Sequence, residues 1–309
     1  MRLWASFWSV MNYMATDLKP RILVTGASSG IGLATAEQLA ARGGEVIMVS
    51  RDQARGAAAR QRVADRATGA APVFLAADLS SQASIRALSA FLHESFDSID
   101  VLINNAGTAS PRRELTVDGI EMTFATNHLA PFLLTHLVFD LLSAAPAARI
   151  IGTTSESHSK RLDFDNLQGE RKYTFFSAYA RSKLANILFT FELARRLAGS
   201  HITANCFTPG PSATNFGRDA GGAMGLMSGL VRLVGRGAES GARTAVCLAT
   251  SPEMDEATGL YYFHGKAAHS KPITYDPGVA ARLWVISEQL THPSREIARE
   301  SRESLEVVQ

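Results

Sequence analysis

The chain alternates short, uninterrupted apolar segments with longer helix-forming ones along most of its length. Seven segments of four to seven residues are rich in Val, Ile, Leu and aromatic residues, at 21–25, 45–49, 73–76, 100–103, 149–153, 201–207 and 260–263. Because they are continuously apolar, both faces of each strand are expected to be buried, as in a parallel sheet. This pattern predicts an α/β fold with one doubly wound, seven-stranded parallel sheet flanked by helices.

The domain boundaries follow from the same pattern. One helix is expected after the first strand, up to Arg42, and others at 80–96, 115–142, 177–198, 239–249 and 278–290. Pro131 is expected to interrupt the region 115–142. Residues 20–291 form the predicted domain, between an N-terminal extension at 1–19, expected to be poorly ordered, and a tail at 292–309. The segment at about 211–237 is rich in glycine and apolar residues, so it is expected to be either a mobile lid or an ordinary surface excursion.

Composition excludes several classes of function. The chain has 309 residues, 46% of them hydrophobic, and a net charge of +2, with no basic stripe. Such a chain fits one globular domain with a large core and gives no reason to expect a nucleic-acid partner. Cys206 and Cys247 are too few for a disulfide framework and belong to no metal-spaced cluster. They are expected to be reduced thiols in a cytoplasmic enzyme without a bound metal.

The first residues are apolar and aromatic. The segment from Leu3 to Met14 is shorter than the roughly 20 apolar residues that cross a bilayer, and it lacks a clear cleavage site of a secretory signal. Three interpretations stay open: a weak interfacial anchor, a segment packed on a neighbour, or an upstream start with Met14 as the natural beginning. No other segment is long and apolar enough to be expected to cross a membrane.

A glycine-rich turn follows the first expected strand. Gly26, Gly30 and Gly32 stand between that strand and the first helix, where glycine allows a sharp turn and lets a pyrophosphate approach the helix N-terminus. Residues 26–30 also match the G-x-S-x-G nucleophile elbow of serine hydrolases. That elbow follows several strands in its own fold, whereas here it follows the first, so dinucleotide binding is favoured.

The end of the second strand indicates which dinucleotide is bound. An NAD site is expected to have a carboxylate there for the ribose 2′-hydroxyl, whereas an arginine accommodates a 2′-phosphate. Here Ser50 is small and neutral, and Arg51 follows it. Asp52 lies one residue further, where an acidic side chain commonly caps a helix. We therefore predict NADP(H) as the cofactor, and Arg55 could assist Arg51.

Small or polar residues also stand at other strand ends. Asp78 ends the third strand, residues 104–107 (Asn-Asn-Ala-Gly) end the fourth, Ser155 follows the fifth, and Pro209-Gly210 follow the sixth, with Thr214 beyond. Open α/β sheets bind ligands at these carboxyl ends.

Tyr179 and Lys183 lie one helical turn apart and share a helix face. A nearby ammonium favours the phenolate of a tyrosine, whose pKa is otherwise near ~10, so the pair can form an acid/base for proton transfer. Asn127 precedes Pro131 in an expected helix that the proline can bend. His158, three residues after Ser155, is either at a pocket mouth or structural.

Together these motifs resemble the short-chain dehydrogenase/reductase family. The family's T-G-x-x-x-G-x-G corresponds to residues 25–32, N-N-A-G to 104–107 and Y-x-x-x-K to 179–183, in family order and spacing, and the resemblance covers about Arg21 to Leu290. The chain is most similar to the retinol-dehydrogenase-like branch, on residues 164–168, 182–189 and 282–284 with Ser287 and Glu288. The resemblance implies a single Rossmann domain.

It also implies a catalytic tetrad. In it Tyr179 exchanges the proton, Ser155 bonds the substrate oxygen, Lys183 binds the nicotinamide ribose and lowers the Tyr179 pKa, and Asn127 positions a water that links Lys183 to solvent. The implied cofactor contacts come from the strand ends: Gly26, Ser28, Ser29, Gly30, Ile31, Gly32, Arg51, Asp78, Leu79, Asn105, Ala106, Gly107, Tyr179, Lys183, Pro209, Gly210 and Thr214. Thr154, where the branch usually has serine, and the absence of a basic residue at Ser28-Ser29 depart from the pattern.

The predicted function is that of an NADP(H)-dependent carbonyl reductase. It would transfer hydride to an apolar aldehyde or ketone, or from the matching alcohol, in a pocket lined by Phe175, Phe176, Met224, Leu226 and Met227. Two alternatives are weighed against it: a non-catalytic NADP-sensing protein, which would usually lack the tyrosine or lysine, and a sugar-nucleotide epimerase, whose glycine spacing differs. The resemblance also allows a homodimer formed through the helices that hold Asn127 and Tyr179.

Overall fold

The computed structural model describes residues 19–210 and 238–291. The proposed lid at 211–237, the extension before residue 19 and the tail from 292 therefore lie outside the described residues, together with Thr214, Met224, Leu226 and Met227.

The described residues form one eight-stranded sheet in the order β3-β2-β1-β4-β5-β6-β7-β8. The strands are β1 (Arg21–Thr25), β2 (Glu45–Ser50), β3 (Val73–Ala76), β4 (Val101–Asn104), β5 (Ala148–Thr153), β6 (Ile202–Thr208), β7 (Tyr261–Phe263) and β8 (Lys266–Ala268). The first seven pair in parallel, which confirms the predicted doubly wound α/β fold. The eighth strand was not predicted: β8 runs antiparallel to β7 after a turn in which His264 and Gly265 have positive φ.

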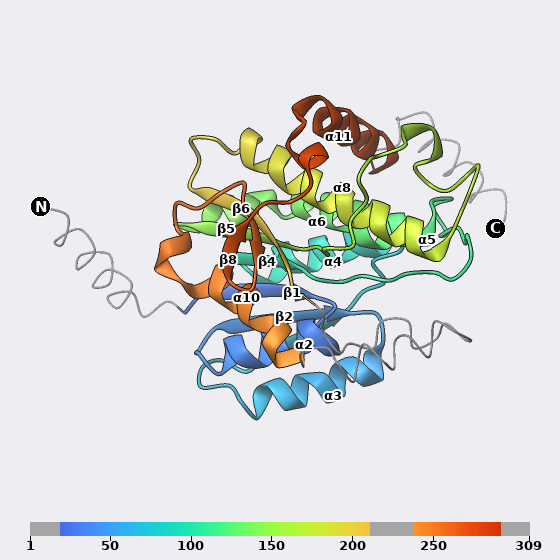
Figure 1. Ribbon diagram of the computed structural model, residues 1–309. Helices are drawn as coiled ribbons and strands as arrows, with labels where there is room; N and C mark the ends of the chain where they lie inside the picture. The colour runs from blue at the N-terminus through green and yellow to red at the C-terminus, as the bar shows by residue number, and fades with distance from the viewer. Residues whose placement is uncertain (1–18, 211–237, 292–309) are drawn as a thin grey trace, which may run out of the picture.

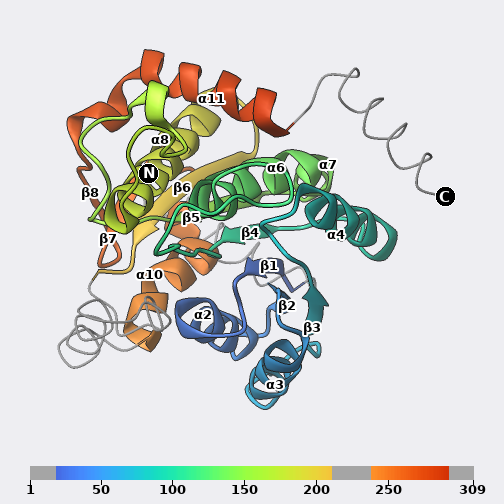
Figure 2. The same cartoon turned by 90° about the vertical axis from the view of Figure 1, so that its right-hand side faces the viewer.

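Helices cover both faces of the sheet (Figures 1 and 2). One face carries α2 (Gly30–Ala40), α3 (Gln53–Ala64) and α10 (Ala238–Thr250), and the other carries α4 (Gln82–Ser95), α6 (Ala130–Leu137) and α8 (Phe175–Arg196). Successive strand residues contribute to opposite cores: Leu23 packs in one buried cluster, whereas Ile22 and Val24 pack in the other. Burial of both strand faces explains why the segments are apolar throughout. The last helix, α11 (Pro277–Thr291), lies outside α8, away from the sheet.

The helical region predicted over 115–142, interrupted by Pro131, has the wrong start. Leu115 and Glu121 instead form an isolated β-bridge, and the helical part begins at Met122. It runs through α5 (Met122–Phe124), the π-helical turn η1 (Ala125–Leu129), α6 and α7 (Phe139–Ala144). The buried Glu121 sets the start, because its carboxylate accepts hydrogen bonds from the N–H groups of Thr123 and Phe124, both at 2.8 Å.

Three short 3-10 turns complete the fold, η2 (Phe164–Asn166), η3 (Pro252–Met254) and η4 (Pro272–Tyr275). The helix with Tyr179 and Lys183 begins at Phe175, two residues earlier than predicted, because Thr174 and Ser177 form a capping box at its N-terminus.

Candidate active site

The turn after β1 requires its glycines. Gly26 and Gly30 have φ values of +68° and +55°, a region that side chains disfavour. At Gly32 a Cβ would lie 2.3 Å from the carbonyl oxygen of Gly26 and 2.4 Å from Nδ2 of Asn105. The backbone therefore makes a tight turn and leads directly into α2.

The N-terminus of α2 is open, unlike those of neighbouring helices. Ser29 occupies the N-cap position in extended conformation, and its side chain makes no capping hydrogen bond. In contrast, Asp52 caps α3 and Ser81 caps α4. Among the described residues, the N–H groups of residues 30–32 have no hydrogen-bond acceptor. Unsatisfied N–H groups at the positive end of a helix dipole suit the phosphates of a dinucleotide.

Thr25 locks the turn after β4 to the glycine turn. Its Oγ1 accepts hydrogen bonds from the N–H groups of Asn105 at 2.9 Å and Ala106 at 3.1 Å. In return, Nδ2 of Asn105 donates to the carbonyl oxygen of Thr25 at 2.9 Å. The side chain of Asn105 thus supports the floor of the candidate cofactor site. The role of Thr25 was missed by sequence reasoning, although the residue lies inside the glycine motif.

The end of β2 leaves Arg51 available. The Arg51 side chain is exposed and makes no hydrogen bond or ion pair with the residues that the structure describes. Asp52 caps α3 as predicted: its carboxylate accepts from the N–H of Arg55 and pairs with the Arg55 guanidinium, both at 2.9 Å. The N–H of Arg55 is the main cause that lowers the pKa of Asp52. Arg55 is therefore engaged with Asp52.

The remaining predicted cofactor residues follow β3 and β6. Asp78 accepts hydrogen bonds from the N–H of Ser80 at 2.9 Å and from its hydroxyl at 2.8 Å, while the neighbouring Leu79 is buried in the core. Pro209 and Gly210 follow β6 directly, and Gly210 has a φ of +71°. All four residues follow the carboxyl ends of parallel strands, where ligands bind in such sheets.

Tyr179, Lys183 and Ser155 come together between α8 and the end of β5. Nζ of Lys183 lies 5.6 Å from the centroid of the Tyr179 ring and donates a hydrogen bond to the carbonyl oxygen of Thr153 at 3.1 Å. The Ser155 side chain forms a hydrogen bond with the Tyr179 hydroxyl. Both hydroxyls and the ammonium therefore belong to one group, as the sequence predicts.

Burial controls the protonation of this group. It raises the pKa of the Tyr179 hydroxyl, while the hydrogen bond with Ser155 acts in the opposite direction. It also lowers the pKa of the Lys183 ammonium to about 8. The ammonium of Lys183 lies near the Tyr179 ring, and burial disfavours the phenolate, so the expectation that Lys183 lowers the Tyr179 pKa stays a prediction.

Asn127 connects the π-turn to α8. Its Oδ1 accepts from the N–H of Thr108 at 2.7 Å, and its Nδ2 donates to the carbonyl oxygen of Thr108 and to Oγ of Ser182, both at 2.9 Å. Ser182 in turn donates to the carbonyl oxygen of Tyr179 at 2.8 Å. Sequence reasoning did not assign a role to Ser182, although the residue lies within the Y-x-x-x-K motif.

The structure gives His158 a structural role. Its ring is buried, and Nδ1 lies 2.8 Å from the carbonyl oxygen of Ser155. Nε2 accepts from the N–H of Lys271 at 3.3 Å, and the Lys271 ammonium donates to the carbonyl oxygen of His158. Burial lowers the pKa of His158. The residue therefore holds the Ser155 loop against the segment before η4.

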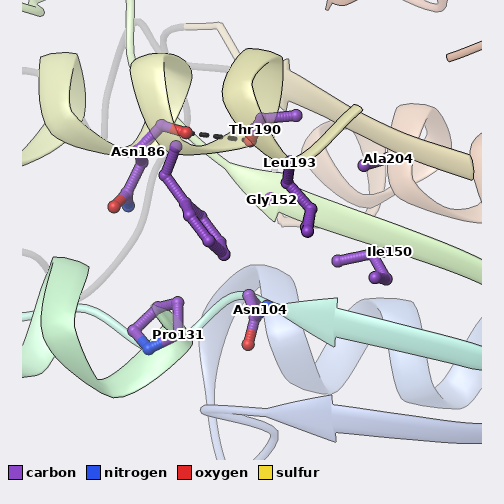
Figure 3. Close-up of a pocket in the computed structure, with 9 residues that line it drawn as sticks. Asn104, Pro131, Ile150, Gly152, Asn186, Thr190, Leu193 and Ala204 are labelled. Carbon is purple, nitrogen blue, oxygen red and sulfur yellow. Dashed lines mark hydrogen bonds between the residues drawn. The ribbon is translucent and has the colours of Figure 1, made fainter. Parts of the chain in front are cut away.

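A small cavity lies beside α8, the helix that carries Tyr179 and Lys183 (Figure 3). Its volume of about 10 Å³ is close to the minimum that a single water occupies. Two of its walls carry the buried amides of Asn104 and Asn186, and Oδ1 of Asn104 has no hydrogen-bond partner among the residues that the structure describes. The lining comes from β4, β5, β6, α6 and α8: Asn104, Pro131, Ile150, Gly152, Asn186, Phe189, Thr190, Leu193 and Ala204.

The sequence model of the short chain dehydrogenases matches residues 20–224. The chain belongs to this family. Its relatives include retinol dehydrogenase 14 of Mus musculus, 40% identical over 283 residues that cover 86% of this chain and 84% of the relative. Human retinol dehydrogenase 13 is 38% identical over 276 residues, which cover 87% of this chain and 83% of that relative. These relatives confirm the retinol-dehydrogenase-like branch within the family.

Solved structures agree with this fold. An uncharacterised protein from Mycobacterium paratuberculosis is 33% identical with a TM-score of 0.69, over 89% of this chain and 96% of that one. A short chain dehydrogenase from Escherichia coli CFT073, solved with NADPH, is 22% identical with a TM-score of 0.63, over 80% of this chain and 97% of that one. At this identity the likeness supports only the shared fold.

The described residues hold neither a membrane-spanning helix nor a cluster of metal ligands. Within residues 19–210 and 238–291, no helix has the length and apolarity needed to cross a bilayer. The same ranges contain no group of three or more His, Cys, Asp or Glu side chains that could hold a metal ion.

Proposed function

We propose that this short chain dehydrogenase is an NADP(H)-dependent oxidoreductase that reduces an apolar aldehyde or ketone, or oxidises the matching alcohol. Membership of the family makes it an oxidoreductase of alcohol and carbonyl groups. The observation that carries the finer proposal is the Tyr179–Ser155–Lys183 group at the end of β5.

The glycine turn and Arg51 fit a dinucleotide with a 2′-phosphate. The open N–H groups of residues 30–32 would bind the pyrophosphate, and the exposed guanidinium of Arg51 would pair with the 2′-phosphate. Asp52 is committed to capping α3 and to Arg55, which disfavours a role at the ribose hydroxyl of NAD. When bound, the cofactor supplies the hydride.

Tyr179 is suited to donate the proton that carbonyl reduction requires. Burial raises the pKa of its hydroxyl, so the phenol is protonated at neutral pH. The Ser155 hydroxyl would donate a second hydrogen bond to the same substrate oxygen, where negative charge develops. Lys183, held by the Thr153 carbonyl, would bind the nicotinamide ribose and offset the charge left on Tyr179 after the transfer.

An apolar substrate is supported by the relatives and by one exposed side chain. Several relatives are named retinol dehydrogenases, so retinoids are the first class to test, followed by steroids, lipid aldehydes and polyketide-like ketones. Phe176, one turn before Tyr179, is 61% exposed, which leaves its ring open to a ligand.

The proposal is tested by NADPH oxidation with a panel of apolar aldehydes and ketones. Tyr179→Phe should abolish turnover and leave NADPH binding intact. Tyr173→Phe is the matched control, because its hydroxyl donates to the carbonyl oxygen of Ser110 at 2.7 Å and plays no part in the proposed proton transfer. Equal turnover in wild type and Tyr179→Phe would remove the assignment of Tyr179.

The same experiment addresses the alternative of a non-catalytic NADP-sensing protein. Such a protein would bind NADPH without turning over any member of the panel. A cytoplasmic location and a homodimer stay predictions.

A further inference from the structure

We propose that α11 is part of the catalytic apparatus, because Ser287 holds His128 and thereby positions the adjacent Asn127. Ser287 and His128 act here as positioning residues. The inference rests on the proposed function, because Asn127 is linked through Ser182 to the backbone of Tyr179, the proposed proton donor.

The hydrogen bonds at Ser287 define which way each proton points. Its Oγ donates to the carbonyl oxygen of Leu283 at 2.8 Å, one turn earlier in α11. The hydroxyl proton is then in use, so Oγ accepts from Nε2 of His128, also at 2.8 Å. Both side chains are fully buried. This contact thus fixes the Nε2-protonated tautomer of His128 and joins residues that are 159 positions apart.

The surroundings of His128 keep it neutral and hold its ring. Burial lowers the pKa of His128 to about 4, against a side-chain hydrogen bond with Asn186 that acts in the opposite direction, so the ring carries no charge at neutral pH. The rings of Phe124, Phe132 and Phe189 surround it, with centroids at 5.1, 6.4 and 6.2 Å. In this apolar setting the imidazole N–H needs a hydrogen-bond acceptor, which Ser287 provides.

A continuous set of contacts leads from α11 to Tyr179. His128 and Asn127 are consecutive residues of the π-turn η1. From Asn127 the path continues through Nδ2 to Oγ of Ser182, and from Ser182 to the carbonyl oxygen of Tyr179. A shift of His128 would therefore move the side chain that links η1 to the catalytic helix.

The π-turn gives this contact its importance. A π-turn has i→i+5 hydrogen bonds, is much rarer than the α-helix around it, and often occurs at functional sites. Its geometry therefore depends on tertiary contacts. Asn127 is fixed on one side by Thr108 and Ser182, whereas Ser287 fixes the neighbouring His128 from the outer layer of the molecule.

The branch-specific residues of α11 acquire a role in this arrangement. Trp284 packs edge-on against Phe132 with centroids 5.1 Å apart, and its Nε1 donates to Glu288 at 2.7 Å. The Arg282 guanidinium lies 4.1 Å from the centroid of the Phe164 ring. The contacts of Trp284 with Phe132 and of Arg282 with Phe164 attach α11 to α6 and to the loop before α8, which supports Ser287.

The test compares Ser287→Ala with Thr291→Val. Thr291 is also fully buried on α11, one turn later, and its hydroxyl donates to the carbonyl oxygen of Ser287 at 2.7 Å. Each variant loses one buried hydroxyl from the same helix, and Ser287→Ala should show the larger fall in melting temperature because it also leaves the buried N–H of His128 without its acceptor. Ser287→Ala should lower kcat about tenfold, because misplacement of a supporting group reduces the rate far more than it reduces binding. Its KM for NADPH should stay within about twofold of wild type, and Thr291→Val should keep the wild-type kcat.

A second readout does not depend on activity. In NMR spectra, wild-type His128 should show the Nε2-protonated tautomer, and Ser287→Ala should displace the side-chain amide signals of Asn127, whereas Thr291→Val should not. Unchanged Asn127 signals, or equal kcat in the two variants while Tyr179→Phe is inactive, would overturn the inference. An active Tyr179→Phe would instead overturn the proposed function, and displaced Asn127 signals would still support the positioning by Ser287.

Discussion

Gly32→Ala sets two effects of opposite sign against each other. Within a helix, alanine is more stable than glycine by about 1 kcal/mol. The new Cβ would lie 2.3 Å from the carbonyl oxygen of Gly26, 2.9 Å from its carbonyl carbon and 2.4 Å from Nδ2 of Asn105. The first two atoms belong to the backbone of the glycine turn, so neither can rotate away. Overpacking of this kind costs about 1–3 kcal/mol, and the short distances place it at the upper end.

The clash should therefore exceed the gain in helix propensity. We expect Gly32→Ala to lower the free energy of unfolding by about 1–2 kcal/mol, measured by urea unfolding with an unchanged m-value. Because the displaced turn also forms the candidate pyrophosphate site, NADPH affinity measured by fluorescence titration should fall at least ~tenfold.

Gly107→Ala is the matched control for stability. Its Cβ would meet no atom of the described residues closer than 3.5 Å, which is ordinary van der Waals contact, so its free energy of unfolding should stay within about 0.5 kcal/mol of wild type. If Gly32→Ala proves as stable as wild type, the turn yields to the methyl group and the reasoning from these distances fails.

Two further predictions concern charge. Arg51→Ala should weaken NADPH binding at least ~tenfold and leave NADH nearly unaffected, because the guanidinium is expected to pair with the 2′-phosphate; equal losses for both cofactors would show that another residue holds it. His128 should make the fold sensitive to acid. Its pKa is lowered from 6.5 to about 4, so the unfolded chain takes up this proton first as pH falls, and the stability present above pH 6.5 is lost towards pH 4. Between pH 7 and 5 the loss should be about 2 kcal/mol by urea unfolding, and a His128→Leu variant with the same loss would contradict this assignment.

The sheet could be predicted from sequence because each parallel strand is buried on both faces. Its apolar runs, such as residues 21–25 and 149–153, leave a continuous local pattern. β8 has no such apolar pattern, since Lys266 to Ala268 is short and mostly exposed. It pairs with β7 because the preceding turn reverses the chain. The predicted helix from residue 115 failed for another reason: the Glu121 carboxylate caps the chain at Met122, and a buried glutamate inside a helical pattern does not reveal that role.

The candidate site was predictable where its signal is local. Tyr179 and Lys183 are four residues apart on one helix, and the glycine turn follows its strand directly. The supporting residues could not be found in this way, because Thr25 and Ser287 act on partners about 80 and 159 positions away. The protonation state of Tyr179 was also hidden: the sequence indicates that Lys183 is near Tyr179, but only the fold shows that burial raises the Tyr179 pKa and so opposes the phenolate.

The place of α11 bears on how two copies of this chain could associate. The homodimer suggested by the family resemblance would pair through the helices that hold Asn127 and Tyr179, yet α11 lies over α8 on its outer side. A second molecule approaching from that direction would meet Val285, which is 48% exposed on α11, before it reached α8. Assembly through this side would therefore bring the outer surface of α11 into the contact between the two copies.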